Sequence, residues 1–535
     1  MSGVAPAEPG MLQTDERVPA RVAEAFLLVV ALVLSVGAIW MVGESMVGGL
    51  PPGFWTYTLG LTGLALALHL LLRFRAPYAD QVILPAVVLL NGLGLAMVLR
   101  IDLEDARFAT PANAGRHFMW ILLAMLCAGV LLWFLRDHRS WRKYTYTAMI
   151  AGIVLVMLPL IPGLGRPING AKVWIFIGPF SLQPAEFAKI AFAVFFAGYL
   201  VTNRDTLALA GRKVLGLQLP RARDLGPILV VWAISLGVLV GQTDLGTSLL
   251  FFGLFVGMLY LATERGGWVA IGLVMFASGA VLAWSIFGHV QRRVDIWLNP
   301  FDPELITGAS FQIVQGLFGL AHGGMFGAGW GEGMPYLVPY AYSDFIYSAL
   351  GEELGLTGLL GILLVYLVIV ERGLRNAIAV RDGFGKLLAG GLAFVMALQL
   401  FVVIGGITRI IPLTGLTLPF MAQGGSSLLA NWVVVALLLR ISDNARRPSA
   451  LPMRGQLAGP TPHEVGQGPS GTGALPVAAG AARDAVAVPG RSANPPGESS
   501  FGPPAGPADG AAADGAAGGA ETTVIVDGPR EGGTR

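Results

Sequence analysis

Charged residues are scarce in this chain of 535 residues. They make up 13% of the sequence, whereas 54% of it is hydrophobic and the mean hydropathy is +0.67. Because soluble domains carry about 25% charged residues, water cannot be the only solvent that this chain meets. The net charge of +2 is small and the basic residues are scattered, which argues against a nucleic-acid partner.

Cysteine and histidine are also rare. The single cysteine, Cys127, lies in an apolar run and cannot form an internal disulfide, so packing alone must hold the external surface together. The six histidines show no metal-ligand spacing, and we predict no metal-binding residues. A cleavable signal peptide is not evident, because the first apolar run follows Arg17 and Arg21 and is too long for one. We expect that run to be an uncleaved anchor.

Long apolar runs, in contrast, are abundant. A helical membrane span needs about 20 predominantly apolar residues. Runs that meet this requirement lie near 22–42, 53–74, 81–100, 117–135, 145–163, 184–201, 225–241, 246–263, 267–288, 345–370, 387–407 and 415–440. The sequence therefore predicts an all-α polytopic membrane protein with about 12 transmembrane helices and a large loop before the tenth.

The basic residues predict how these spans are oriented. Lys and Arg gather in four loops, at 73–75, 136–143, 204–223 and 372–386. Of the loops between them, 43–52 has no basic residue and 289–343 has only Arg292 and Arg293. Because basic loops stay in the cytoplasm, both termini are expected there, and segments 164–183 and 289–343 are expected to face outward. We look for functional residues in these outward segments.

After about Arg447 the chain is rich in Gly, Ala and Pro and almost free of large apolar residues. Such a segment cannot bury enough surface to offset its ordering entropy, so a disordered tail is predicted. The short run Thr522–Val526 is more simply part of this tail than a docking peptide.

The first outward segment leads into a helix that carries two ionisable residues. Pro184 is at a favourable N1 position, which puts Glu186 and Lys189 three residues apart on one helical face. Ionisable residues at membrane depth usually face a cavity or a partner. Two interpretations stay open here: a structural ion pair, or a lysine that Glu186 orients toward an anionic headgroup.

A second polar cluster, Gln242 to Thr247, separates two apolar runs. Asp is favoured at helix N-caps, so Asp244 is expected to cap the following helix. The alternative is that Asp244 lines a polar pocket.

Segment 289–343 is the richest in polar residues. It contains Arg292, Gln312, Gln315 and a glycine-rich stretch at 323–333, and it leads to Asp344 at the start of the next span. Asp344 is there either a helix N-cap or a functional carboxylate at the membrane boundary. The glycines could let the backbone approach a phosphate, although such a loop alone is weak evidence.

The last cluster, residues 406–427, breaks a span with two prolines and paired glycines. It includes Arg409, Ser426 and Ser427. Irregular backbone at membrane depth is tolerated only where it is buried in protein or lines a wet cavity, so this cluster predicts a functional cavity.

In this order, the four clusters resemble the SEDS family (the FtsW, RodA and SpoVE proteins), which serves cell shape, elongation, division and sporulation. The resemblance covers about residues 80–445. It rests on the runs Asn-Gly…Trp…Gln-Pro-x-Glu-Phe-x-Lys, Asp-Leu-Gly-Thr, Ser-Asp-Phe-Ile…Gly-Glu-Glu-Leu-Gly and Pro-Leu-Thr-Gly-Leu-Thr-Leu-Pro-Phe…Gly-Gly-Ser-Ser. The last cluster and Asn431-Trp favour the elongation (RodA) type over division or sporulation types.

Family members typically have ten spans, which implies an N-terminal extension with two transmembrane helices at 1–78. The glycosyltransferase core is then 79–445 and the cytoplasmic tail 446–535. This extension, the Gly/Ala-rich composition and the tail resemble actinobacterial members.

The resemblance implies a plasma-membrane peptidoglycan glycosyltransferase that polymerises lipid II, a disaccharide-pentapeptide on an undecaprenyl pyrophosphate carrier. Its usual partner is a class B penicillin-binding protein, and the catalytic base falls on Asp344. A divalent cation, Mg²⁺ or Mn²⁺, could bridge the pyrophosphate. Candidate substrate-binding residues are Lys172, Trp174, Glu186, Lys189, Asp244, Arg292, Gln312, Gln315, Arg409, Ser426 and Ser427. A lipid II flippase and a non-catalytic scaffold are the alternatives, and Trp174 could instead be an interfacial anchor.

Three departures from the family pattern surround these residues. A usual pair of basic residues is here Lys172-Val173, and a usual Glu and His before Asp344 are Tyr340 and Tyr342. The usual Ser-Tyr before Gly-Gly-Ser-Ser is Ala422-Gln423. These departures leave Asp344 in place but change its expected neighbours.

Overall fold

A computed structural model describes residues 20–105, 113–168, 171–178, 180–209, 211–214, 217–220, 233, 237 and 241–448. Within this part of the chain, eleven helices are long and apolar enough to cross a membrane. Each overlaps one of the predicted runs. The one remaining predicted run, 225–241, lies almost wholly outside the described residues.

Nine of these helices are uninterrupted, the helix at Ile346–Ala379 is broken at Gly355, and the span at His138–Leu160 combines a 3₁₀ turn, η2 (His138–Tyr144), with α5 and a short 3₁₀ turn, η3 (Leu158–Leu160). The helices of the eleven spans are α1 (Val22–Val47), α2 (Phe54–Arg75), α3 (Ile83–Asp105), α4 (Ala114–Phe134), α5 (Thr145–Met157), α6 (Pro184–Leu209), α8 (Leu245–Thr263), α9 (Gly266–Ile286), α13 (Ile346–Ala379), α14 (Gly383–Ile407) and α15 (Gly425–Arg446). The last helix begins ten residues later than the predicted run 415–440, because residues 415–424 are not helical.

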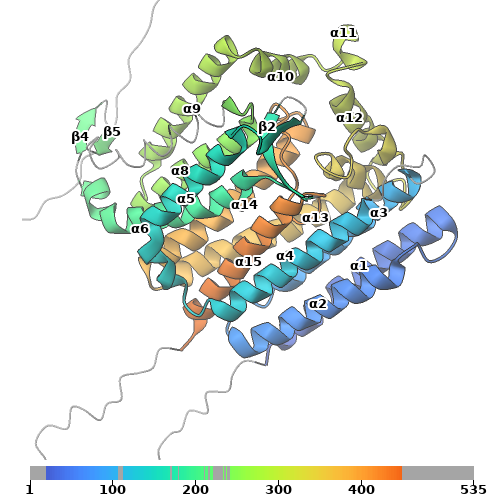
Figure 1. The fold of residues 1–535 in the computed structure, drawn as a ribbon, viewed down its shortest axis with the longest axis horizontal. Helices are drawn as coiled ribbons and strands as arrows, with labels where there is room; N and C mark the ends of the chain where they lie inside the picture. Colours follow the sequence, from blue (N-terminus) through green and yellow to red (C-terminus); the bar gives the residue numbers. More distant parts are fainter. Residues whose placement is uncertain are drawn as a thin grey trace, which may run out of the picture. The chain divides into compact units, whose positions relative to one another are not determined.

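The central helices of the bundle are α3, α6, α14 and α15, which are largely buried. Helix α13 packs along α14, α4 packs on α15, and α5 packs on α6. Figure 1 shows α1 and α2 at one edge of the bundle, beside α3 and α4. Helix α9 is at the opposite edge and is mostly exposed, as a lipid-facing helix can be.

A buried ionic network fixes the α1–α2 hairpin to the rest of the bundle. Arg21, just before α1, pairs with Glu24, and Glu24 Oε1 lies 2.6 Å from Nδ1 of His69 on α2. The Arg21 guanidinium also donates to the carbonyls of Ala76 and Ala79, both at 3.0 Å. Charges buried in this way persist only when they are paired and hydrogen-bonded. The two N-terminal helices are thus an integrated part of the fold.

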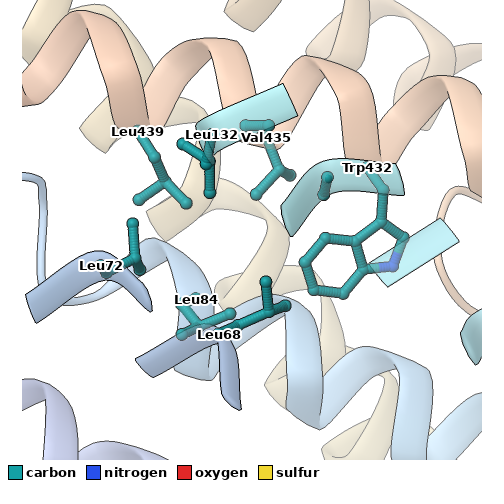
Figure 2. A pocket seen from close by; sticks show the side chains of 9 residues that line it. Leu68, Leu72, Leu84, Leu132, Trp432, Val435 and Leu439 are labelled. Carbon is teal, nitrogen blue, oxygen red and sulfur yellow. The ribbon is translucent and has the colours of Figure 1, made fainter. Parts of the chain in front are cut away.

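Apolar contacts complete this attachment. Figure 2 shows Leu68 and Leu72 of α2 facing a small pocket whose other walls include Leu84 of α3 and Trp432 and Leu439 of α15. All the lining residues are apolar. Helix α2 therefore covers a hydrophobic face that the core helices would otherwise present to lipid.

Short strands, which the all-α prediction did not include, precede and follow α6. Strands β1 (Gly165–Ile168), β2 (Ala171–Ile177) and β3 (Phe180–Leu182) form an antiparallel sheet in the order β1-β2-β3. Gly165 pairs with Ile175, and Ile175 pairs with Leu182. A second hairpin consists of β4 (Gly211–Val214) and β5 (Leu217–Pro220).

The segment before α13 is folded rather than open. It contains α10 (Gly288–Leu298), α11 (Pro303–Ile306), α12 (Phe311–Gly323) and the 3₁₀ turn η4 (Pro335–Leu337). Helix α12 packs on the first turns of α13, so this segment lies directly over the start of that span.

The glycine-rich stretch packs on a break in α13. Gly355, inside that helix, has a φ of 68° and a ψ of −174°. The backbone around this break pairs with the stretch: the N–H of Ala328 donates to the carbonyl of Glu352 at 2.9 Å, and the N–H of Leu356 donates to that of Gly324 at 3.0 Å. A Cβ on Gly355 would lie 2.2 Å from the backbone N of Gly327. The glycines thus approach protein backbone, where the sequence had suggested a phosphate.

A buried arginine locks this arrangement. Arg100 of α3 donates from Nε to Glu353 Oε1 at 2.7 Å and from Nη2 to the carbonyl of Gly333 at 2.7 Å. Glu352 accepts from the backbone N–H of Met334 at 2.9 Å. The two glutamates of the Gly-Glu-Glu motif therefore hold the glycine-rich stretch against α13.

We predict that Gly355→Ala destabilises the protein, because alanine cannot adopt this φ without strain of about 1–3 kcal/mol and its Cβ would overlap Gly327. The melting temperature in detergent should fall, and the glycine-rich stretch should become sensitive to protease. Gly361→Ala, in the same helix with no atom near the added Cβ, is the control and should preserve stability. Equal melting temperatures for the two variants would contradict this account of the break.

Candidate active site

Asp344 lies immediately before α13, against an irregular segment of the chain. The Ser343 hydroxyl donates to Asp344 Oδ1 at 2.9 Å. A Cβ on Gly415 would be 3.8 Å from Asp344 Oδ2, and Gly415 has a φ of 76° that favours glycine. The helix itself has no side-chain N-cap. The carboxylate is therefore not a helix cap and faces residues 408–424.

These irregular residues connect α14 and α15, and core side chains satisfy their backbone. Gln399 of α14 donates to the carbonyl of Thr417 at 3.1 Å, and the Tyr366 hydroxyl of α13 donates to that of Pro419. The backbone N–H of Gln423 donates to the carbonyl of Tyr342 at 2.9 Å. Non-helical backbone at membrane depth needs such internal partners, and they hold this segment beside Asp344.

Arg293 of α10 provides the positive charge at this site. Its Nη1 donates to the carbonyl of Leu413 at 2.8 Å, so it is fixed to the irregular segment. It interacts electrostatically with both Asp244 and Asp344. Burial lowers the pKa of the Arg293 guanidinium, and these two carboxylates oppose that change. The arginine is thus a half-buried cation whose charge acts on two acids.

From the sequence, the neighbouring Arg292 is the candidate substrate-binding arginine, and its side chain is exposed. A helical pattern could have distinguished the two arginines. Val290, Arg293 and Trp297 are spaced three and four residues apart, which puts them on one face of α10, and Val290 is buried. The face that packs inward therefore carries Arg293.

The two acids at the site are both shifted toward the protonated form. Burial raises the pKa of Asp344 to about 6, while the Ser343 hydroxyl and Arg293 lower it and Asp244 raises it further. Burial also raises the pKa of Asp244, against the hydrogen bonds from Thr247 and the charge of Arg293. A carboxylate that titrates near neutral pH can exchange a proton during a reaction.

Asp244 does cap α8, as the sequence predicted. Its side chain accepts from the backbone N–H of Thr247 at 3.1 Å and from the Thr247 hydroxyl at 2.5 Å. The same carboxylate is within electrostatic range of Arg293, Asp344 and Glu186. The cap interpretation is therefore confirmed, and the same carboxylate acts electrostatically on the neighbouring charged side chains.

Lys189 is buried and its donors are all engaged by the protein. Its ammonium donates to Glu186 at 2.6 Å and to Gln399 and Asn431, both at 3.0 Å. An ammonium has three donors, so none is left for a headgroup. Both Lys189 and Glu186 are at most 5% exposed. This geometry favours the structural ion pair over the anion-binding alternative.

The β1-β2-β3 sheet contacts the site through its backbone. The N–H of Lys172, on β2, donates to the carbonyl of Gln242 at 3.3 Å, two residues before Asp244. The Lys172 side chain is exposed, and that of Trp174 is half-buried. Ser426 accepts from the backbone N–H of Gln183 at 3.1 Å. The sheet and the residue that follows it are thus hydrogen-bonded to the Gln242–Thr247 cluster and to the start of α15.

Other candidates are engaged elsewhere. The Arg409 side chain donates to the carbonyl of Trp297 at 3.1 Å, which ties the irregular segment to α10. Gln312 donates to the carbonyl of Pro339 at 2.8 Å, and Gln315 lies one turn further along α12. Ser427 accepts from Asn431 at 3.2 Å. Arg409 and Gln312 thus connect separate segments of the chain, whereas the Ser427 bond lies within α15.

Comparisons with known proteins address the identity of the chain. The family model FTSW_RODA_SPOVE, described as a cell cycle protein, matches residues 81–447. The chain is 48% identical over 432 residues to the peptidoglycan glycosyltransferase RodA of Mycobacterium tuberculosis, a match that covers 80% of this chain and 92% of that relative. The chain belongs to the FtsW/RodA/SpoVE family.

Further comparisons agree with this family. The RodA of Mycobacterium leprae is 46% identical over 431 residues, which cover 80% of this chain and 91% of that protein. A solved peptidoglycan synthase complex contains a chain with a TM-score of 0.56 and 24% identity, covering 69% of this chain and 99% of its own length. The family resemblance, its RodA type and the polytopic membrane fold are confirmed, and the chain is a peptidoglycan glycosyltransferase.

In the described part of the chain, no three His, Cys, Asp or Glu side chains are arranged to hold a metal ion. Asp344, Asp244, Arg293 and the Glu186–Lys189 pair are charged side chains at or near the site.

We predict that Glu186→Gln and Lys189→Met each lower stability by about 3–5 kcal/mol, because each leaves one buried charge without its partner. The double variant should regain most of that loss. Thermal unfolding in detergent measures both effects. If the pair is structural, the refolded double variant should also polymerise glycan at a rate near that of the wild type. A stable double variant without activity would instead show that Lys189 acts on substrate.

Proposed function

We propose that the chain polymerises lipid II, with Asp344 as the general base. The observation that carries this proposal is a half-buried carboxylate, with its pKa raised to about 6, beside Arg293 and an irregular segment. With a pKa of about 6, the carboxylate of the resting enzyme is mostly ionised near neutral pH. It can therefore accept a proton from a sugar hydroxyl.

In the proposed step, Asp344 removes the proton from the 4-hydroxyl of the acceptor sugar. The hydroxyl oxygen forms a bond to the anomeric carbon of the donor sugar. The bond between that carbon and the pyrophosphate oxygen breaks, and its electron pair leaves with the lipid pyrophosphate. A base of this kind contributes about 10²–10⁴-fold to the rate.

The leaving pyrophosphate needs positive charge, which we assign to Arg293 and Lys172. Arg293 is half-buried and held by the carbonyl of Leu413, so solvent screens its charge only in part. Lys172 is exposed beside the segment of Asp244 and is free to move toward an anion. A Mg²⁺ or Mn²⁺ ion carried by the pyrophosphate would supplement these cations.

The site is proposed to face the outside of the cell, with both termini in the cytoplasm. The basic loops at 73–75, 136–143 and 372–386 support this orientation. A class B penicillin-binding protein is the proposed partner. Its support is the similar fold of a chain in a solved peptidoglycan synthase complex that coordinates polymerisation and crosslinking.

We predict that Asp344→Asn reduces lipid II polymerisation by about 10²–10⁴-fold, because asparagine cannot accept the proton. Purified protein, with its penicillin-binding partner, is given lipid II and the glycan product is separated by size. Ser343→Ala, which removes only the hydrogen bond to Asp344, should retain most activity. Equal product from wild type and Asp344→Asn would exclude Asp344 as the base. If neither protein makes polymer but lipid II is transported, the flippase alternative is supported. If neither polymerisation nor transport is observed, the scaffold alternative is supported.

The pH dependence provides a second test. Activity should rise as the pH increases through about 6, where Asp344 becomes ionised. Arg293 stabilises the ionised form, so Arg293→Gln should raise the pKa of Asp344 and move this rise to a higher pH. Arg292→Gln is the matched control, since Arg292 is exposed, and it should leave the profile unchanged. Identical profiles for both variants would contradict the assigned role of Arg293.

A further inference from the structure

An apolar groove of about 380 Å³ opens between α5, α6 and α15, away from the Asp344 site. Trp141 and Tyr144 of η2 lie at one end of its lining. Ala148 of α5 and Ala191 of α6 leave space along its walls. Its volume is within the range of about 300–1,000 Å³ that is usual for sites that bind small ligands.

Basic residues accompany the aromatic end of the groove. Arg136, Arg139, Arg142 and Lys143 lie within eight residues, and all four are exposed. The ammonium of Lys143 is 4.8 Å from the centre of the Tyr144 ring, which lines the groove. Among the described residues, Arg139 pairs with Asp382, whereas Arg142 and Lys143 form no ion pair with a carboxylate. Two cations without a carboxylate partner among the described residues therefore lie beside the aromatic end of the groove.

The groove is distinct from the proposed catalytic site. Its basic end adjoins Thr145, the first residue of α5, whose hydroxyl donates to the carbonyl of Arg142. Near the other end of α5, the carbonyl of Val156 accepts from Gln242, which is two residues before Asp244. Thr145 and Val156 are eleven positions apart along α5, which separates these ends by about 16 Å at 1.5 Å per residue. A headgroup at Lys143 is thus far from Asp344.

We propose that this groove binds an anionic phospholipid from the leaflet that surrounds η2. One acyl chain lies along Ala148 and Ala191, and the phosphate contacts Arg142 and Lys143. Clusters of four or more basic residues beside a membrane span attract anionic headgroups. Trp141 and Tyr144 are suited to the interface between acyl chain and headgroup. An apolar channel with cations at one end matches an amphiphile with a negative head.

Lipid binding to the purified full-length protein tests this proposal. The protein is equilibrated in detergent with equal amounts of phosphatidylglycerol and phosphatidylcholine, and retained lipid is measured by native mass spectrometry. Phosphatidylglycerol should be retained preferentially. The variant Arg142→Gln/Lys143→Gln should weaken that retention by about tenfold to thirtyfold, at roughly 1 kcal/mol for each cation. The control, Arg73→Gln/Arg375→Gln, makes the same charge change at other exposed positions and should not.

The acyl-chain part of the proposal has a separate test that leaves the cations in place. Phosphatidylglycerol with brominated acyl chains should quench the fluorescence of wild type more than that of Trp141→Phe. Ala191→Leu fills the groove. In a protein that carries this change, brominated lipid should quench fluorescence equally with and without Trp141→Phe. Equal retention of both phospholipids, or an equal loss in the control, would overturn the proposal. Displacement of phosphatidylglycerol by undecaprenyl pyrophosphate at equal concentration would also overturn it, because the groove would then hold the substrate carrier.

Discussion

The site depends on one cation, Arg293, which binds the irregular segment and acts on two acids. Its hydrogen bond to Leu413 fixes α10 to residues 408–424, and its charge acts on Asp244 and Asp344. Without this charge, the two carboxylates would repel each other in a desolvated space. With the charge of Arg293, the pKa of Asp344 is held at about 6, close to neutral pH. In the proposed mechanism, the same guanidinium then meets the charge of the leaving pyrophosphate.

The irregular segment that Arg293 binds can exist at membrane depth only because helices on several sides satisfy it. Gln399, Tyr366 and Tyr342 each pair with its backbone. The break in α13 follows the same rule, since the glycine-rich stretch supplies the missing partners at Gly355. Both departures from helical structure therefore lie where other parts of the chain cover them, and both border the start of α13. The cost of irregular backbone at this depth is offset by these internal hydrogen bonds.

Much of this architecture could be predicted from the sequence, because membrane spans depend on local composition. The apolar runs identified eleven described helices, and the preference of Asp for N-caps identified the role of Asp244. Contacts between distant parts of the chain were not accessible in this way. The acceptors of Lys189 come from positions 210 and 242 residues further along the chain. Single-residue spacing therefore left its two interpretations open.

The choice of Arg292 instead of Arg293 has a related cause. The sequence predicts that both face outward, but only the orientation of α10 decides which one contacts the irregular segment. The glycine-rich stretch was also misassigned, because glycine permits close approach to a phosphate and to another backbone equally well. Its actual partner, the break at Gly355, is not visible as a break in an otherwise apolar run.

The titration of Asp344 in the resting protein tests the central claim most directly. Isotope-edited infrared spectra of wild type minus Asp344→Asn would follow the carbonyl band of that one side chain as the pH is changed. The account predicts half-protonation near pH 6 in the absence of substrate. A carboxyl that titrates near the ordinary aspartate value of about 3.9 would contradict it, because Asp344 would then be neither desolvated nor prepared to accept a proton.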